Sequence, residues 1–155
     1  MMQRVTNCIL IDDRQALLIK KPRRGWYAIP GGKMEQGETV KESVIREYRE
    51  ETDLHLINPS LIGVFTFNIF TGTTCVQEWM MFTFVSRAYT GTMASYCTEG
   101  ELEWIPLDAI ASLPMAEGDR SIFDHIQTSD DILYASFSYT DDYELIGINI
   151  NPTGR

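Results

Sequence analysis

The sequence lacks the features that would place its 155 residues in a membrane or in a disulfide-bonded class. No apolar run approaches the roughly 20 residues that span a bilayer. The N-terminal stretch MMQRVTNCILIDD ends in two aspartates and carries no small-residue cleavage site. The cysteines, Cys8, Cys75 and Cys97, form neither a CxxC pair nor a Cys/His pattern, so we expect no zinc site and no disulfide framework. A reduced, cytoplasmic protein is the simplest interpretation.

Positive charge is also scarce. The 13 lysines and arginines face 22 aspartates and glutamates, and the net charge is −9. This balance argues against binding duplex nucleic acid or an anionic membrane, both of which need basic patches. It does not exclude a nucleotide, because a divalent cation can lie between acidic side chains and phosphates. A monomer and a homodimer both remain open.

Length and composition predict one domain over residues 1–155, since 44% of the residues are hydrophobic and no repeat or linker interrupts the chain. We expect hairpins at 5–19 and 61–85, short strands at 26–29 and 102–105, and closing strands at 133–137 and 143–150. Residues 30–32 are expected to form a turn, residues 86–100 a loop, and residues 107–113 and 118–126 helices. Helices among mixed hairpins predict an α/β (α+β) fold, an α/β/α sandwich around a mixed β-sheet.

The clearest helix signal begins at Thr39. Thr39 and Glu42 have the spacing of a capping box, in which each side chain binds a backbone amide of the other residue. An apolar stripe follows at helical spacing, made of Val40, Val44 and Tyr48. The helix is expected to end near Thr52, which would place Asp53 at a left-handed cap that glycine prefers.

This helix carries unusual negative charge. Residues 32–54 hold seven of the 22 acidic residues, and Glu47, Glu50 and Glu51 share one helical face. Like charges at this spacing repel by roughly 0.2–0.5 kcal/mol per pair. Arg46 can reach Glu50 one turn later but cannot neutralise all three carboxylates. The alternatives are a solvated acidic face and a cation site.

The order of these residues resembles the Nudix box. Gly32 is followed after five residues by Glu38, after seven more by Arg46-Glu47, and then by Glu50-Glu51. The box normally closes with glycine where this chain has Asp53.

Resemblance to the Nudix family implies a hydrolase of nucleoside diphosphate derivatives that uses Mg²⁺, with Mn²⁺ as an alternative. It implies that Glu47, Glu50 and Glu51 hold metal, that the Gly31 carbonyl adds a ligand, and that Arg46 orients a glutamate. Gly32 and Glu38 would support the site.

The wider chain resembles the MutT-type branch of the family, whose members hydrolyse oxidised purine nucleoside triphosphates such as 8-oxo-dGTP. The stretch ending in Pro-Gly-Gly-Lys33 is typical of that branch, and by this resemblance Lys33 is expected to bind the substrate. By this resemblance Glu99 is a further metal ligand or the general base, and Glu117 and Asp119 read the base. Ala28 stands where animal enzymes of this type carry a base-binding asparagine, which leaves the base preference open.

Other residues have two interpretations. Arg23 and Arg24 could touch phosphates or form a solvated turn. Phe67 could stack on a base, although a core position is the stronger expectation, and Trp79 could serve either purpose. Glu117 and Asp119 could simply favour the start of a helix.

These features predict a Mg²⁺-dependent enzyme that splits a nucleoside triphosphate into a monophosphate and pyrophosphate. Glu47 or Glu99 would act as the base. The alternatives are a Nudix hydrolase of ADP-ribose, a nucleotide sugar or capped RNA, and a non-catalytic nucleotide-binding module. Such modules usually lose box glutamates, which this chain keeps.

Overall fold

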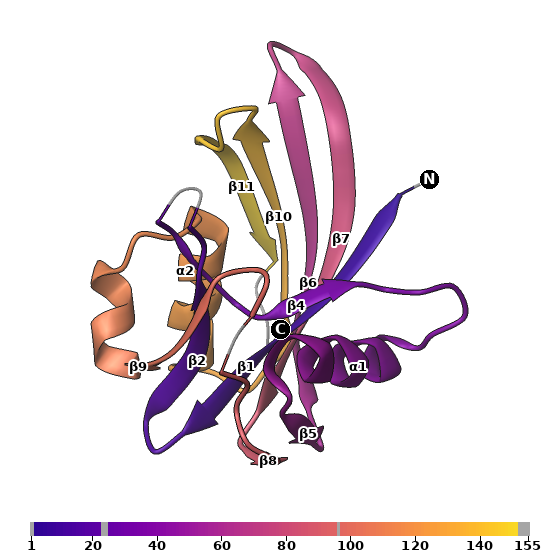
Figure 1. The fold of residues 1–155 in the computed structure, drawn as a ribbon. Coiled ribbons are helices and arrows are strands. Elements are labelled where there is room, and N and C mark those ends of the chain that lie inside the picture. The colour runs from indigo at the N-terminus through magenta and orange to yellow at the C-terminus, as the bar shows by residue number, and fades with distance from the viewer. Residues whose placement is uncertain (1, 23–24, 96, 152–155) are drawn as a thin grey trace.

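A long mixed β-sheet runs through the protein (Figure 1). The structure is a computed structural model that describes residues 2–22, 25–95 and 97–151. Within this part of the chain the main sheet follows the order β11-β10-β6-β7-β1-β2-β3, with β4 pairing to β1 and β9 pairing to β2. Its strands are β1 (Gln3–Asp12), β2 (Gln15–Lys20), β3 (Tyr27–Ala28), β4 (Gly31–Lys33), β6 (Ser60–Thr71), β7 (Thr74–Ser86), β9 (Glu101–Pro106), β10 (Leu133–Thr140) and β11 (Leu145–Asn151).

Strand β1 joins the two halves of the sheet. Its first part pairs in parallel with β7, from Gln3 opposite Trp79 to Leu10 opposite Ser86. The same part pairs antiparallel with β4, and the end of β1 turns into β2. The second parallel pair is β6 with β10, so antiparallel and parallel ladders alternate from β11 to β2, whereas β3 and β9 both pair antiparallel with β2. The expected mixed sheet is confirmed.

The two faces of the sheet bury separate cores. Ile9 and Ile11 of β1 belong to the core that α2 (Glu117–Ile126) covers with Ile122 and Phe123. Alternate residues of β1, such as Cys8 and Leu10, belong to the core that α1 (Val40–Thr52) covers. Figure 1 shows α1 and α2 on opposite sides of β1. Because side chains alternate along a strand, the single strand β1 serves both cores, and the predicted α/β/α layering is confirmed.

Three local predictions are wrong. The segment expected to be a loop at 86–100 contains β8 (Ala88–Thr90), which pairs with β5 (His55–Ile57) in a small separate sheet. The expected turn at 30–32 instead contributes β4. The last strand begins at Leu145, not at 143, because Tyr143 adopts a left-handed conformation with φ 64° in the preceding turn.

The helices after β9 lie close to their predicted positions. Residues 107–112 form a short 3₁₀ helix, Leu107–Ser112, and α2 begins at Glu117. No helix in the described residues is long and apolar enough to cross a membrane.

Candidate active site

Both ends of α1 are fixed by local hydrogen bonds. The Glu42 amide donates to Thr39 Oγ1 at 3.1 Å, and the Thr39 amide donates to Glu42 Oε1 at 2.9 Å, so the capping box is confirmed. At the other end Asp53 takes a left-handed conformation with φ 63°, and its amide donates to the Arg49 carbonyl at 2.9 Å. Val44 and Tyr48 are fully buried and fix the rotation of α1 about its axis, so that the polar face with Arg46 and Glu47 lies beside β4.

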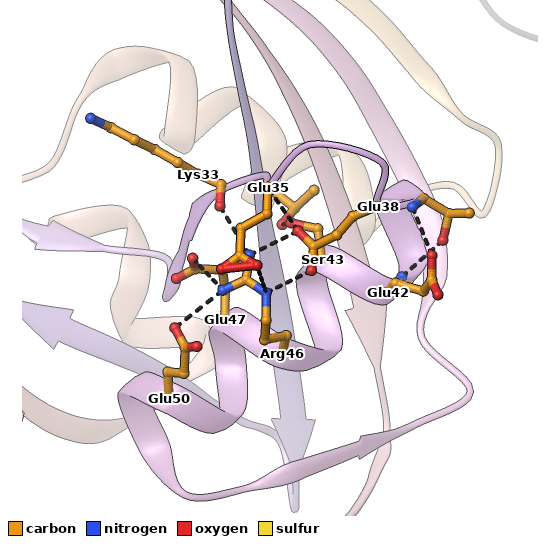
Figure 2. A network of polar contacts seen from close by, with 10 residues as sticks. Lys33, Glu35, Glu38, Glu42, Ser43, Arg46, Glu47 and Glu50 are labelled. Atoms are coloured by element: carbon orange, nitrogen blue, oxygen red, sulfur yellow. Dashed lines mark hydrogen bonds and ion pairs between the residues drawn. The ribbon is translucent and has the colours of Figure 1, made fainter.

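Arg46 is the centre of the polar network on this face (Figure 2). Its Nε and Nη2 donate to the two carboxylate oxygens of Glu38 at 2.6 and 2.9 Å. Its Nη1 donates to Glu47 Oε1 at 2.9 Å and to Glu50 Oε2 at 3.2 Å. Nη2 also donates to the Lys33 carbonyl at 3.1 Å. Arg46 therefore joins β4, the following loop and α1 through all its N–H groups.

The ion pair with Glu38 has an electrostatic consequence. The Arg46 guanidinium, together with the backbone amide of Glu35, holds the pKa of the Glu38 carboxyl at about 2. The same carboxylates raise the pKa of Arg46 above its ordinary value, with Glu38 as the largest cause. Bidentate arginine–carboxylate pairs of this kind fix geometry as well as charge. The pair is thus ionised across the physiological pH range.

Gly31 and Gly32 are required by close packing. A Cβ on Gly32 would overlap the Glu47 carboxylate, and a Cβ on Gly31 would overlap the Thr6 carbonyl and Asn7. Neither glycine is among the described residues with positive φ. These glycines therefore let a strand lie directly against the carboxylate of α1, where we had expected a turn.

Glu51 is the half-buried carboxylate of the group that has a fully buried oxygen. Its Oε2 is buried and has no hydrogen-bond partner among the described residues. Burial raises the pKa of Glu51 to about 7; Lys21 opposes this shift, whereas Glu99 and Glu47 add to it. An unpaired buried carboxylate oxygen is unfavourable unless a cation or proton lies against it.

Glu99 lies on the loop before β9. It forms an ion pair with Lys21 at 3.2 Å. Because Glu99 and Lys21 both act on the Glu51 carboxyl, the structure brings these three residues into one electrostatic neighbourhood. Lys21 was not singled out from the sequence, and its only signal was the basic run at 20–24.

The carboxylates fit a hard divalent cation by their chemistry but do not yet converge on one point. No group of three or more His, Cys, Asp or Glu side chains within the described ranges could hold a metal in this conformation. In this conformation Arg46 binds Glu50 and one oxygen of Glu47. Glu50 is 58% exposed, and exposed ion pairs contribute only about 0.2–1 kcal/mol. The contact with Arg46 therefore holds Glu50 only weakly.

An open cavity of about 710 Å³ lies beside this region. Its lining comes from two segments of the chain, with Lys20, Lys21, Pro22 and Gly25 from the first and residues 93–95, 97–98 and 100–102 from the second. This volume is within the range of about 300–1,000 Å³ that is usual for small-molecule sites. The predicted phosphate contact Arg23 lies outside the described residues. Lys33 binds Arg46 through its carbonyl, and Figure 2 shows its side chain pointing away from the network.

The predicted base-reading residues lie on the other face of the sheet. Phe67 is buried and stacks on Trp79 and Phe137 with ring centroids 5.2 and 5.3 Å apart. Phe67 thus has the core position that was the stronger expectation, and the half-buried Trp79 is the outer ring of the stack.

The start of α2 packs against these aromatic rings. The Gly118 amide donates to the Tyr139 hydroxyl at 2.8 Å, and the Tyr139 ring lies 6.2 Å from that of Phe67. Asp119 and Glu117 flank Gly118. Burial raises the pKa of Asp119 to about 7, whereas the exposed Glu117 forms an ion pair with Arg120.

The sequence did not indicate Tyr27 and Glu103 as site residues. The Tyr27 hydroxyl is hydrogen-bonded to Glu103, which raises the pKa of Tyr27. The other Glu103 oxygen, Oε2, is buried without a partner among the described residues. Strands β3 and β9 both pair with β2, and only this pairing brings Tyr27 and Glu103 together.

Residues 1–126 match the NUDIX domain family. The chain is a Nudix hydrolase. It therefore belongs to a family of enzymes that act on diphosphate bonds, and such enzymes typically use a divalent metal.

Individual relatives agree with this assignment. An uncharacterised Nudix hydrolase, YvcI of Bacillus subtilis, is 52% identical over 151 residues, which cover 97% of this chain and 96% of the relative. The crystal structure of a mutator MutT protein from Bacillus halodurans superposes with a TM-score of 0.95 at 49% identity and covers 99% of this chain and all of that one. An ADP-ribose pyrophosphatase of Methanocaldococcus jannaschii is 48% identical over 61 residues, or 37% of this chain and 36% of the relative.

Proposed function

We propose that this Nudix hydrolase is a Mg²⁺-dependent pyrophosphohydrolase of nucleoside triphosphates that releases a monophosphate and pyrophosphate. The observation that carries the proposal is the carboxylate group of α1, in which Glu51 has a buried, unpaired oxygen beside Glu47 and Glu99. Hard cations such as Mg²⁺ take oxygen ligands and bridge carboxylates to phosphates. Glu47, Glu50, Glu51, Glu99 and the Gly31 carbonyl would hold the metal, with Mn²⁺ as a substitute.

When bound, the metal polarises the phosphoryl group and lowers the pKa of the attacking water. The protein supplies positioning and proton transfer. Arg46 holds Glu47 in place through Nη1 and is itself fixed by Glu38. Glu47 or Glu99 accepts the proton from the water, and each is close enough to Glu51 to raise its pKa.

We infer that the base of the substrate is an oxidised purine such as 8-oxoguanine, so that the enzyme would cleanse the nucleotide pool and thereby protect DNA. The support is the arrangement at the start of α2, where Asp119 lies beside an aromatic stack and burial raises its pKa to about 7. A carboxyl group that titrates near neutrality can donate or accept a hydrogen bond on a base edge. The likeness to a MutT protein agrees with this substrate class.

A second candidate substrate is ADP-ribose, which the partial match to an ADP-ribose pyrophosphatase favours. The deciding experiment is a panel of 8-oxo-dGTP, dGTP, ADP-ribose, a nucleotide sugar and NAD-capped RNA, assayed with Mg²⁺ and analysed by chromatography of the products. We expect the highest kcat/KM for 8-oxo-dGTP, with monophosphate and pyrophosphate as products.

A higher kcat/KM for ADP-ribose than for any triphosphate would overturn the proposed substrate but leave the metal site intact. Tight nucleotide binding without hydrolysis under Mg²⁺ or Mn²⁺ would overturn the enzymatic proposal as a whole and favour a binding module.

A further inference from the structure

Strand β11 forms one margin of the main sheet. It pairs antiparallel with β10 regularly from Tyr134 opposite Asn151 to Ser138 opposite Gly147, and a bulge at Ile146 then shifts the register to Tyr139 opposite Leu145. In the sheet order β11 stands at the end, so among the described strands none pairs with its other edge. Figure 1 shows β11 beside β10 at this margin. The outer backbone N–H and C=O groups of β11 are thus free to pair with another strand.

The exposed apolar side chains gather at this margin. The large exposed hydrophobic residues of the described chain are Met2, Ile57, Val76, Tyr134, Tyr143, Ile146, Ile148 and Ile150. Five of these lie on β10, on β11 or in the turn between them. The three isoleucines alternate along β11 and are 55%, 47% and 45% exposed. They form an apolar row along the open edge.

The same strand carries no charge. Its sequence, Leu-Ile-Gly-Ile-Asn-Ile-Asn, has no Asp, Glu, Lys or Arg, whereas the whole chain has a net charge of −9. Proteins usually protect an open edge with charged residues, proline, a β-bulge or a covering segment, and the bulge of β11 lies at its start, which leaves residues 147–151 regular. An uncharged, isoleucine-rich edge instead favours pairing with another apolar, uncharged strand.

We propose that β11 pairs antiparallel with β11 of a second copy of this chain and so extends the sheet across a two-fold axis. Two copies with the same negative charge repel over most of their surfaces, so an uncharged strip is where they can approach. A basic protein would be attracted to the acidic surface elsewhere on the molecule and not to this uncharged strip.

The sequence of β11 is complementary to itself. With the axis at Ile148, this residue faces Ile148 of the partner subunit, and Ile146 faces Ile150 of the partner subunit. The small residue Gly147 then lies opposite Asn149 of the partner subunit. Because residues two apart lie on one face, the isoleucines of both strands form one continuous apolar row. A two-fold contact of this kind uses the same patch on both subunits.

The test is the solution mass of the full chain measured by light scattering over a concentration series. The wild-type protein should reach twice the chain mass of 17.7 kDa. Ile148→Lys should raise the dissociation constant at least about tenfold, because like charges then lie directly opposite each other. The matched control is Val76→Lys, which puts the same charge on β7 at a residue that is 56% exposed, and it should dimerise as the wild type does.

A mixing experiment tests the axis itself. Ile148→Lys and Ile148→Glu should each be monomeric alone but should form a mixed dimer when combined, because the opposite charges meet across the axis. Circular dichroism checks that the variants are folded, and Ile146→Lys replaces Ile148→Lys if the latter fails to fold.

A monomeric wild type, or Ile148→Lys chains that still dimerise, would overturn the proposal and leave the edge open to a strand of another protein. Charge-swapped chains that do not associate with each other would overturn the axis at Ile148.

Discussion

Replacing Arg46 with lysine should destabilise the protein markedly although the charge is kept. Arg46 donates hydrogen bonds to Glu38, Glu47, Glu50 and the Lys33 carbonyl. A lysine ammonium has three donors on one atom and cannot reproduce the planar fork. At least two of the five hydrogen bonds must therefore be lost, and lysine cannot form the bidentate pair with Glu38.

The expected size of the effect follows from the exposure of each contact. A hydrogen bond to a charged group contributes about 1.5–3 kcal/mol when it is shielded from water, and an exposed ion pair contributes far less. Arg46 is 24% exposed, whereas Glu50 is 58% exposed, so the contact with Glu50 adds little. We expect Arg46→Lys to lower the free energy of unfolding by about 2–3 kcal/mol and the Tm by about 4–12 °C.

The assay is thermal and urea unfolding in the presence of a chelator, so that metal binding does not contribute. The matched control is Arg49→Lys, an exposed arginine on the same helix, for which the change should stay within about 0.5 kcal/mol. A double-mutant cycle with Glu38→Gln should show that the two losses are not additive, because both remove the same pair. Equal stability of the Arg46→Lys and Arg49→Lys variants would refute the reasoning.

Further predictions concern turnover and pH. Glu50→Gln should lower kcat by at least about 100-fold with the Tm unchanged within a few degrees, whereas Glu42→Gln on the same helix should keep near-normal turnover; steady-state kinetics decides between them. Gly32→Ala should lower kcat because its Cβ would overlap the Glu47 carboxylate, and an unchanged kcat would contradict that packing. Burial raises the pKa of Asp119 to about 7 from an ordinary 3.8, so the charged carboxylate is destabilising above pH 7. Asp119→Asn should therefore stabilise the fold above pH 7, and urea unfolding should show that this gain disappears as the pH falls toward 4.

The sequence predicted best those features that depend on neighbours along the chain. The capping box of Thr39 and Glu42 and the left-handed cap at Asp53 are set within a few residues, and both are confirmed. The layered mixed sheet also followed from the alternation of hairpins and helices. Strand β8 could not be predicted, because its three residues form a strand only by pairing with β5, about 30 residues earlier.

The same distinction holds for the site. The contacts of Arg46 with Glu38, Glu47 and Glu50 lie within eight residues of it, so the spacing of the motif could suggest them. The pair of Lys21 with Glu99 spans 78 residues, and no local pattern signals it. The role of Gly32 was misjudged for a related reason. A glycine in a sequence suggests a turn, whereas here its use is to leave room for Glu47, which only the packed structure reveals.

The contacts of the Arg46 guanidinium also constrain the number of residues in the segment before α1. Two hydrogen bonds of the guanidinium each close a loop of the chain. One bond is to the Lys33 carbonyl, 13 residues away, and the other is to the Glu38 carboxylate, eight residues away. One residue more or fewer between 33 and 38 would leave the hydrogen bond to Glu38 in place but would break the hydrogen bond to the Lys33 carbonyl. The number of residues in this segment is therefore as much a part of the site as their identity.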